Sequence, residues 1–97
     1  MEQNQPPQQQ LQIKAGDEEM RGAYSNLMQI VHTKEEFVFD FFLNVPPQGL
    51  LVSRAIVSPG HAKRIAAALA ENIKGYEEKF GTITGSELPE KKIGFVK

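Results

Sequence analysis

The sequence contains no cysteine and only two histidines among its 97 residues. Disulfides, thiolate chemistry and cysteine-bound zinc or iron–sulfur clusters are therefore excluded, and a metal site built from histidines is not expected. No apolar run approaches the ~18–20 residues that cross a bilayer. Residues 1–10 have neither a basic segment nor an apolar segment. We therefore expect no signal peptide and a cytoplasmic location.

Charge and motifs are equally sparse. The net charge is -1 and the sequence pI is about 6.1, which argues against nucleic-acid binding by bulk charge. The chain has no P-loop, dinucleotide fingerprint, nucleophile elbow or zinc-ligand spacing. Catalysis needs an activated group held by a partner, and the sequence offers no such pair. We expect a protein that is not an enzyme and that uses no cofactor, no metal and no membrane.

The composition suits one small folded domain. Apolar residues make up 40% and charged residues 24% of the chain, as in soluble globular proteins. Residues 1–10, MEQNQPPQQQ, predict a disordered Gln- and Pro-rich tail. Residues 82–97 are rich in Gly, Lys and Glu and predict a flexible C-terminal tail. A single α+β domain is expected over residues 11–81.

Short runs of strand character follow one another through the first part of this domain. Leu11–Ala15 alternates apolar and polar residues as a short strand does, and an acidic turn follows it. Polar links at 33–36 and 46–49 have hairpin length. They separate three runs rich in β-branched and aromatic residues: Tyr24–His32, Phe37–Val45 and Leu50–Ser58. The pattern predicts an antiparallel β-meander of three to four strands.

One long C-terminal helix is predicted from Pro59 to Phe80. Ser58 can serve as its N-cap, Pro59 fits the first helical position because no N–H is needed there, and Gly81 can end it. Apolar residues recur at alternating intervals of four and three, which draws one stripe along the helix. These residues are Ala62, Ala66, Leu69, Ile73, Tyr76 and Phe80.

Both faces of the predicted sheet are apolar. If each hairpin closes around its four-residue link, Val45 faces Leu50 and His32 faces Phe37. One face then carries an apolar surface that Arg54 interrupts. Its members are Tyr24, Met28, Ile30, Phe37, Phe39, Phe41, Leu43, Val45, Leu50, Val52 and Ile56. One helix about 10 Å wide cannot cover two faces, and a core of ~70 residues is marginal alone. We therefore expect a homodimer.

The apolar stripe of the predicted helix has two interpretations. It can be the face that packs on its own sheet, or a seam between the helices of two subunits. Both interpretations place the same side chains in the core or at the dimer interface: Phe39, Phe41, Leu69, Ile73, Tyr76 and Phe80.

Two segments carry a family pattern, YSNLMQIVHTKEEFVFDF and VSRAIVSPGHAKRIAAALAENIKGYEEKFG. The second holds S-R-x-I-V-S-P-x-H-A-K-R followed by L-x-x-N-I-x-x-Y-E-x-x-F-G. Through these segments, the chain from Ala23 to Ile83 resembles a small bacterial family catalogued as domain of unknown function 3467. The resemblance implies a shared fold and no particular reaction. By topology alone, a sheet followed by a long helix is also similar to the SecB-type export chaperones, whose subunits assemble.

Basic residues gather where the third strand leads into the helix. A helix N-terminus presents unpaired N–H groups and a partial positive charge. Cations beside it favour a bound phosphate, carboxylate or acidic partner segment. The candidates for this anion or acidic-partner site are Arg54, His61, Lys63 and Arg64. Alternatively, Lys63 and Arg64 are solvated or pair with Asp40, Glu77 or Glu78, and His61 helps to cap the helix.

Arg54 has a second interpretation, as half of a structural ion pair. A buried guanidinium needs a carboxylate or carbonyl partner. Asp40 is a candidate, although the predicted register puts it on the opposite face, and only a register slip or a bulge would bring the two together. At the 33–36 link, His32 lies beside Lys34 and two glutamates, where we expect solvated charges of a hairpin tip rather than a catalytic or metal site.

The sequence therefore predicts a non-enzymatic protein-interaction module that acts as a homodimer, with a second copy and an unidentified protein as partners. One alternative is a binding module for nucleic acid or an anionic ligand at the helix N-terminus, although the thin basic surface does not favour nucleic acid. The other is a SecB-like chaperone with an exposed apolar groove.

Overall fold

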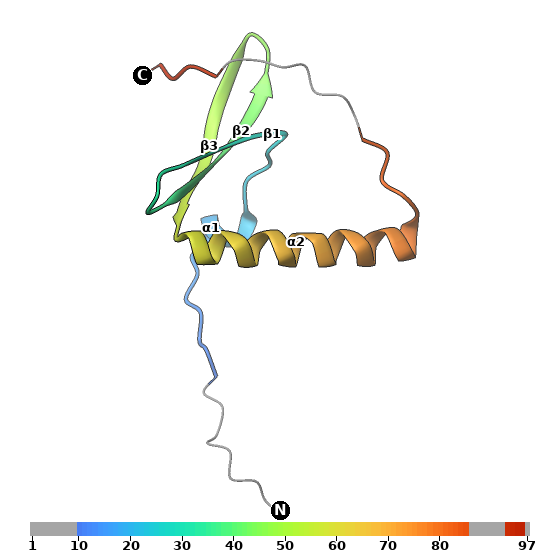
Figure 1. Cartoon of the computed structure of the whole chain (residues 1–97). Helices are drawn as coiled ribbons and strands as arrows, with labels where there is room; N and C mark the ends of the chain where they lie inside the picture. The colour runs from blue at the N-terminus through green and yellow to red at the C-terminus, as the bar shows by residue number, and fades with distance from the viewer. Residues whose placement is uncertain (1–9, 86–92, 97) are drawn as a thin grey trace, which may run out of the picture. The chain divides into compact units, whose positions relative to one another are not determined.

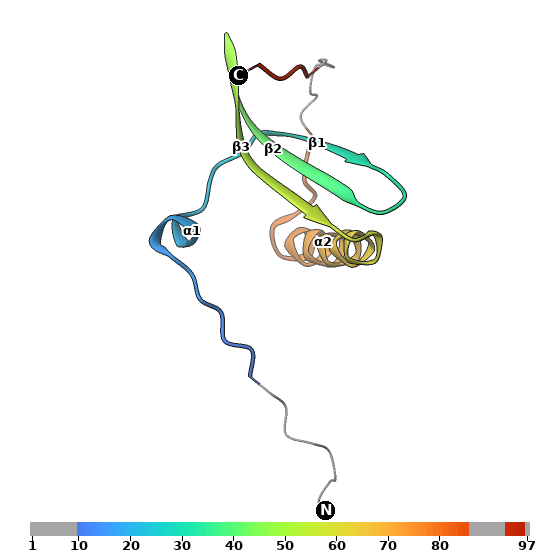
Figure 2. The ribbon, with the colours of Figure 1, turned by 90° about the vertical axis from the view of Figure 1, so that its left-hand side faces the viewer.

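The computed structural model describes residues 10–85 and 93–96. Its elements follow the order α1 (Asp17–Arg21), β1 (Leu27–His32), β2 (Phe37–Val45), β3 (Gln48–Val57) and α2 (Pro59–Phe80) (Figure 1). The strands form one antiparallel sheet in the order β1-β2-β3, visible in Figure 2. An α+β fold with a meander followed by a long helix is confirmed. The predicted tails at 1–10 and 82–97 lie largely outside the described residues.

Contacts divide the chain into two compact units. The first comprises residues 1–31 and 38–56, which include most of the sheet, and the second comprises 32–37 and 57–97, which include α2. The prediction of a single domain over 11–81 stays a prediction.

The segment before the sheet differs from its prediction. Leu11–Ala15 is not a strand, and α1 occupies what was expected to be an acidic turn. Gly16 caps this helix, and its N–H donates to Glu19 Oε1 at 2.9 Å. Acidic residues in the first turn favour a helix because their negative charge interacts favourably with the positive end of the helix dipole. Alternating residues alone do not make a strand when no neighbouring strand supplies hydrogen bonds.

The β1–β2 hairpin closes as predicted. Thr33 N–H donates to Glu36 O at 2.9 Å, and Thr33 Oγ1 accepts the N–H groups of Glu35 and Glu36. His32 consequently lies opposite Phe37, and their rings stack with centroids 5.2 Å apart. Threonine thus supplies with its hydroxyl the bonds that the turn cannot make with its backbone.

β1 is shorter than predicted because its first residues bond through side chains. Asn26 accepts Asn44 N–H at 2.7 Å and donates to Asn44 O at 3.2 Å. Ser25 Oγ lies 3.0 Å from both Leu27 O and Phe42 O. Serine and asparagine side chains can replace ladder hydrogen bonds in this way, so the regular strand begins at Leu27.

The β2–β3 hairpin corrects the predicted register. The link contains Pro46 and Pro47, joined by a cis peptide bond, rather than four residues. An unbroken ladder around this link would put Asp40 and Arg54 on opposite faces, yet the two side chains are hydrogen-bonded. A one-residue offset between β2 and β3, as at a β-bulge, accounts for this contact.

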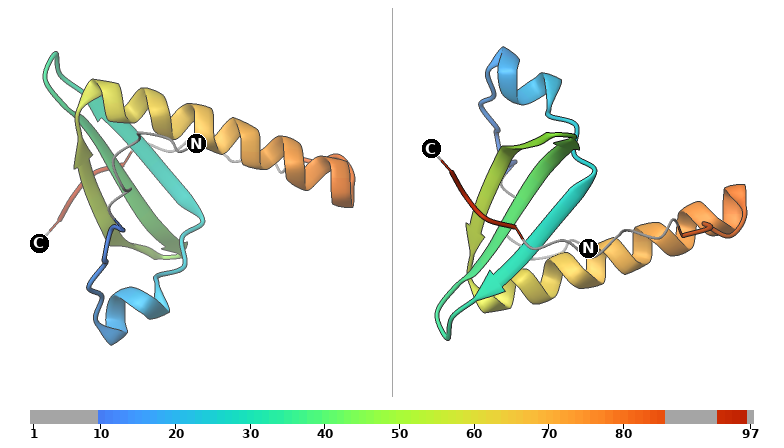
Figure 3. Two further views of the ribbon diagram at one scale, coloured as in Figure 1. Left: turned by 90° about the horizontal axis from the view of Figure 1, so that it is seen from below. Right: turned by 90° about the horizontal axis from the view of Figure 1, so that it is seen from above.

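The offset changes which residues share a face. Arg54 lies on the face of Asp40, because the two side chains are hydrogen-bonded. Its predicted place on the face of Phe39 and Phe41 is therefore wrong. Figure 3 shows the sheet from two sides, with β2 in the middle.

Helix α2 has the bounds and caps that the sequence predicts. Ser58 is extended, with φ -71° and ψ 158°, and its Oγ accepts the N–H of His61 at 3.1 Å. Pro59 occupies the first turn. Gly81 adopts φ 95°, a left-handed conformation that favours glycine, and its N–H donates to Glu77 O at 2.9 Å.

Candidate functional site

Asp40 is the buried polar residue of the described part of the chain, and it pairs with Arg54. Arg54 Nε donates to Asp40 Oδ1 at 2.6 Å, and Arg54 Nη2 donates to Oδ2 at 2.9 Å. The Asp40 side chain is 2% exposed and that of Arg54 is 46% exposed. Two parallel bonds between a guanidinium and a carboxylate are the strongest form of this interaction. Asp40, proposed from the sequence as the partner of Arg54, is the partner in the structure.

The pair also fixes the charge on Asp40. The hydrogen bonds from Arg54 lower the pKa of the Asp40 carboxyl below its ordinary value, and burial opposes that shift only in part. The same contact raises the pKa of the Arg54 guanidinium. Asp40 is therefore a carboxylate near neutral pH, and it accepts hydrogen bonds but has no proton to donate. Its chemistry is that of an anchor rather than of a general acid.

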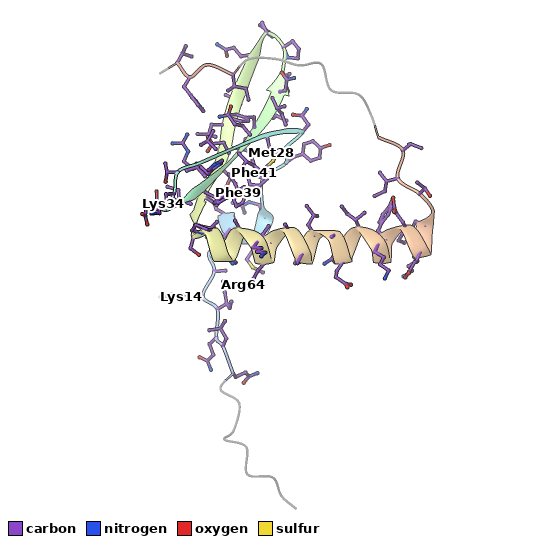
Figure 4. The ribbon with its side chains drawn as sticks, in the orientation of Figure 1. Lys14, Met28, Lys34, Phe39, Phe41 and Arg64 are labelled. Atoms are coloured by element: carbon purple, nitrogen blue, oxygen red, sulfur yellow. The ribbon has the colours of Figure 1, made fainter. Side chains whose placement is uncertain are left out.

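The structure separates the four candidate anion-binding residues into two groups. Arg54 lies in the unit of the sheet and uses two N–H groups on Asp40. His61, Lys63 and Arg64 lie at the start of α2, exposed, with Arg64 Nη2 3.4 Å from His61 Nδ1. Anion binding by these residues stays a prediction. Figure 4 labels Arg64 at the start of α2.

Along α2, apolar side chains remain exposed. We call the six residues predicted to share one helical face the apolar stripe, and its larger members are exposed as follows: Leu69 58%, Ile73 40%, Tyr76 51% and Phe80 66%. No side chain of the helix is buried. Tyr76 and Phe80 contact each other, with ring centroids 5.0 Å apart, and the ammonium of Lys79 lies 5.5 Å from the centre of the Phe80 ring.

Shallow hollows flank the stripe on both sides. One is lined by Ala70, Ile73, Lys74, Glu77 and Glu78, and the other by Glu71, Asn72, Gly75, Tyr76, Lys79 and Phe80. Residues spaced by three, four and seven, such as 70, 73, 74 and 77, form the diamond-shaped holes into which side chains of a neighbouring helix insert.

On the sheet, large side chains occupy the face opposite Asp40. Phe39 and Phe41 are half-buried and Met28 on β1 is exposed (Figure 4). Sequence reasoning identified these residues but missed two features. One is the side-chain bonding of Ser25 and Asn26, for which the pair of polar residues opening a strand-like run was the available signal. The other is the one-residue offset between β2 and β3, for which the single arginine on an apolar face was the signal.

The described part of the chain shows neither a cluster of metal ligands nor a membrane-spanning helix. Residues 10–85 and 93–96 contain no group of three or more His, Asp or Glu that could hold a metal ion. In the same ranges, neither helix has the length and hydropathy of a membrane span.

The chain belongs to the family described as "Protein of unknown function (DUF3467)", whose model matches residues 1–85. The family resemblance seen in the sequence is thereby confirmed. No curated protein and no solved structure matches the chain significantly. Its function must therefore be inferred from its own residues.

Proposed function

We propose that this member of the DUF3467 family is a non-enzymatic protein-interaction module that works as a homodimer. One observation carries the proposal: among the large apolar side chains of the described residues, Phe42 is buried, at 6% exposure, whereas most others remain open to solvent. Full burial of one such side chain contributes only ~1.5–3 kcal/mol. A folded domain requires more apolar burial than this, and a second copy supplies it.

The exposed residues are too many and too regularly placed to be scattered surface positions. They include, from the sheet, Met28, Ile30, Val31, Val45, Leu50, Leu51 and Ile56, and from α2, Leu69, Ile73, Tyr76 and Phe80. Large contiguous apolar patches mark interaction surfaces in soluble proteins.

Light scattering coupled to size-exclusion chromatography tests the proposal. We expect a species of about 21.6 kDa at micromolar concentration, twice the chain mass of 10.8 kDa. A monodisperse monomer under those conditions would refute it.

A SecB-like chaperone is distinguished by what the assembled protein leaves exposed. A chaperone needs an apolar groove that stays open after assembly, so it should slow the aggregation of an unfolded client. The proposed dimer covers its apolar surface, so we expect no such effect at equal molar amounts of client and protein. Strong suppression of aggregation would favour the chaperone instead.

A further inference from the structure

We propose that α2 pairs with α2 of a second copy in antiparallel orientation and that this helix pair forms the helical part of the dimer interface. The inference rests on the homodimer proposed above and adds to it the element and its direction. The occupant of the apolar stripe is thus the same stripe of another chain. The spacing of its side chains indicates that α2 pairs with another helix, and two further properties, side-chain size and charge, support an antiparallel over a parallel pair.

The spacing of the stripe is that of a two-stranded helix pair. Intervals of four and three repeat every seven residues, which keeps one seam facing a partner helix. In heptad terms, Ala66, Ile73 and Phe80 take the first core position, and Ala62, Leu69 and Tyr76 take the second. An antiparallel pair joins a first-position residue of one helix to a second-position residue of the other in every layer.

Side-chain size is graded along the stripe. Its first members are Ala62 and Ala66, and its last are Tyr76 and Phe80. A parallel pair would set alanine against alanine at one end, leaving a gap, and crowd aromatic rings at the other. An antiparallel pair sets small against large, as close packing requires. The layers are Ala62 with Phe80, Ala66 with Tyr76, and Leu69 with Ile73, each occurring twice around the two-fold axis.

The charges of α2 favour the same orientation. The first turn has no acidic residue and is followed by Lys63 and Arg64, whereas Glu77 and Glu78 lie near the end, just before Lys79. Lys63, Arg64 and the two glutamates each lie toward the end of the helix whose dipole has the same sign as their own charge, which is unfavourable in an isolated helix. An antiparallel neighbour brings Lys63 and Arg64 of one copy beside Glu77 and Glu78 of the other. A parallel neighbour would bring like charges together.

One charged pair is placed for direct contact. Lys63 and Glu77 each follow a second-position core residue, so they border the stripe on the same side. In an antiparallel pair, Lys63 of each copy faces Glu77 of the other. Within one helix they are about 21 Å apart at 1.5 Å per residue and cannot meet. Glu77 Oε2 accepts Ile83 N–H at 2.9 Å, and a carboxylate has a second oxygen for a lysine.

A charge exchange with matched controls tests the orientation. At low salt, we expect Lys63→Glu and Glu77→Lys each to raise the dimer Kd about tenfold, because two attractions become two repulsions. The double variant with both changes should return to within about threefold of the wild-type Kd. Arg64→Glu and Glu78→Lys make the same changes one residue away, on the outer side of the helix, and should change the Kd less than threefold. Sedimentation equilibrium measures all five variants.

Crosslinking of single cysteines gives an independent readout, because the chain has no cysteine of its own. Ala70 borders the seam near the two-fold axis, so Ala70→Cys should form a covalent dimer with a short bismaleimide. Ala62→Cys should not, because the two copies of residue 62 lie about 27 Å apart in an antiparallel pair. Efficient crosslinking through Ala62→Cys with none through Ala70→Cys would establish a parallel pair and overturn the inference.

The outcomes separate this inference from the proposed function. A wild-type monomer overturns both. A dimer that crosslinks through neither cysteine, and whose Kd is unchanged by Lys63→Glu and Glu77→Lys, uses another surface. That result would support the homodimer and contradict the antiparallel helix pair. Rescue by the double variant together with crosslinking through Ala70→Cys supports both.

Discussion

Helix α2 and the β-sheet differ in how far their side chains are buried within one copy of the chain. Both ends of α2 are capped, by Ser58 and by Gly81 at φ 95°, yet none of its side chains is buried. The sheet buries Phe42 and the carboxylate of Asp40, at 6% and 2% exposure. The backbone of α2 is therefore capped at both ends while its side chains remain exposed, whereas the sheet buries a phenylalanine and a carboxylate that pairs with Arg54.

The difference shows which features depend on distant residues. A helix cap needs only residues within one turn, but most helical stability in proteins comes from packing an apolar face against something else. The register of β3 against β2 is fixed by contacts within one copy, because a one-residue slip of β3 would carry Arg54 away from Asp40. The strand register of the sheet is thus fixed within one copy, whereas the apolar stripe of α2 is left exposed in it.

Removal of the Phe42 ring is the most severe test of the sheet's interior. We expect Phe42→Ala to lower the free energy of unfolding by about 3–5 kcal/mol, as truncations of buried aromatic residues do. Phe41→Ala is the matched control on the opposite face, where the ring is half-buried, and should cost less than half as much. Urea denaturation followed by circular dichroism measures both. Equal losses would show that the sheet does not bury one face in preference to the other.

Asp40→Asn breaks the pair that aligns β2 with β3. The substitution keeps the shape of the side chain but removes the charge-assisted hydrogen bonds, and we expect a loss of about 1–3 kcal/mol. Asp17→Asn changes the other aspartate of the chain, an exposed one in α1, and should cost under about 0.5 kcal/mol. Urea midpoints report the two values. An Asp40→Asn protein as stable as the wild type would mean that the pair does not fix the register.

Elements fixed by neighbouring residues could be predicted from the sequence. The bounds of α2 follow from Ser58, Pro59 and Gly81, whose effects are confined to the helix ends. The β1–β2 hairpin follows from a polar link of four residues between two apolar runs. Asp40 could be named as the partner of Arg54 because an arginine on an apolar face needs a carboxylate.

The face on which Arg54 lies could not be predicted. Shortening the link from four residues to Pro46 and Pro47 moves the pairing by two residues and leaves each side chain on its predicted face, whereas a one-residue offset moves the later side chains to the opposite face. No residue of the two strands marks where such an offset lies. The predicted place of Arg54 on the face of Phe39 and Phe41 was wrong for this reason.

Ser58→Ala tests how much the N-cap of α2 contributes to stability. Loss of the hydroxyl leaves His61 N–H without its protein acceptor, and we expect a cost of about 1 kcal/mol, within the ~0.5–2 kcal/mol range of such caps. Ser53→Ala, on exposed β3, is the matched control and should change stability by under about 0.5 kcal/mol. Thermal and urea denaturation give the comparison. A larger effect from Ser53→Ala would contradict the assignment of Ser58 as the cap.

The pH dependence of the unfolding free energy tests the Asp40–Arg54 pair of the sheet, and its expected effect is smaller than those of the substitutions above. The pKa of Asp40 is lowered from 3.8 in the folded protein by its hydrogen bonds to Arg54. The unfolded chain therefore binds this proton first, so the contribution of the pair is fully present above pH ~4 and disappears as the pH falls through the lowered folded-state value. We expect the wild type to lose more stability than Asp40→Asn between pH 5 and pH 2. Parallel curves for the two proteins would place the acid sensitivity in other carboxylates and remove Asp40 as the titrating anchor.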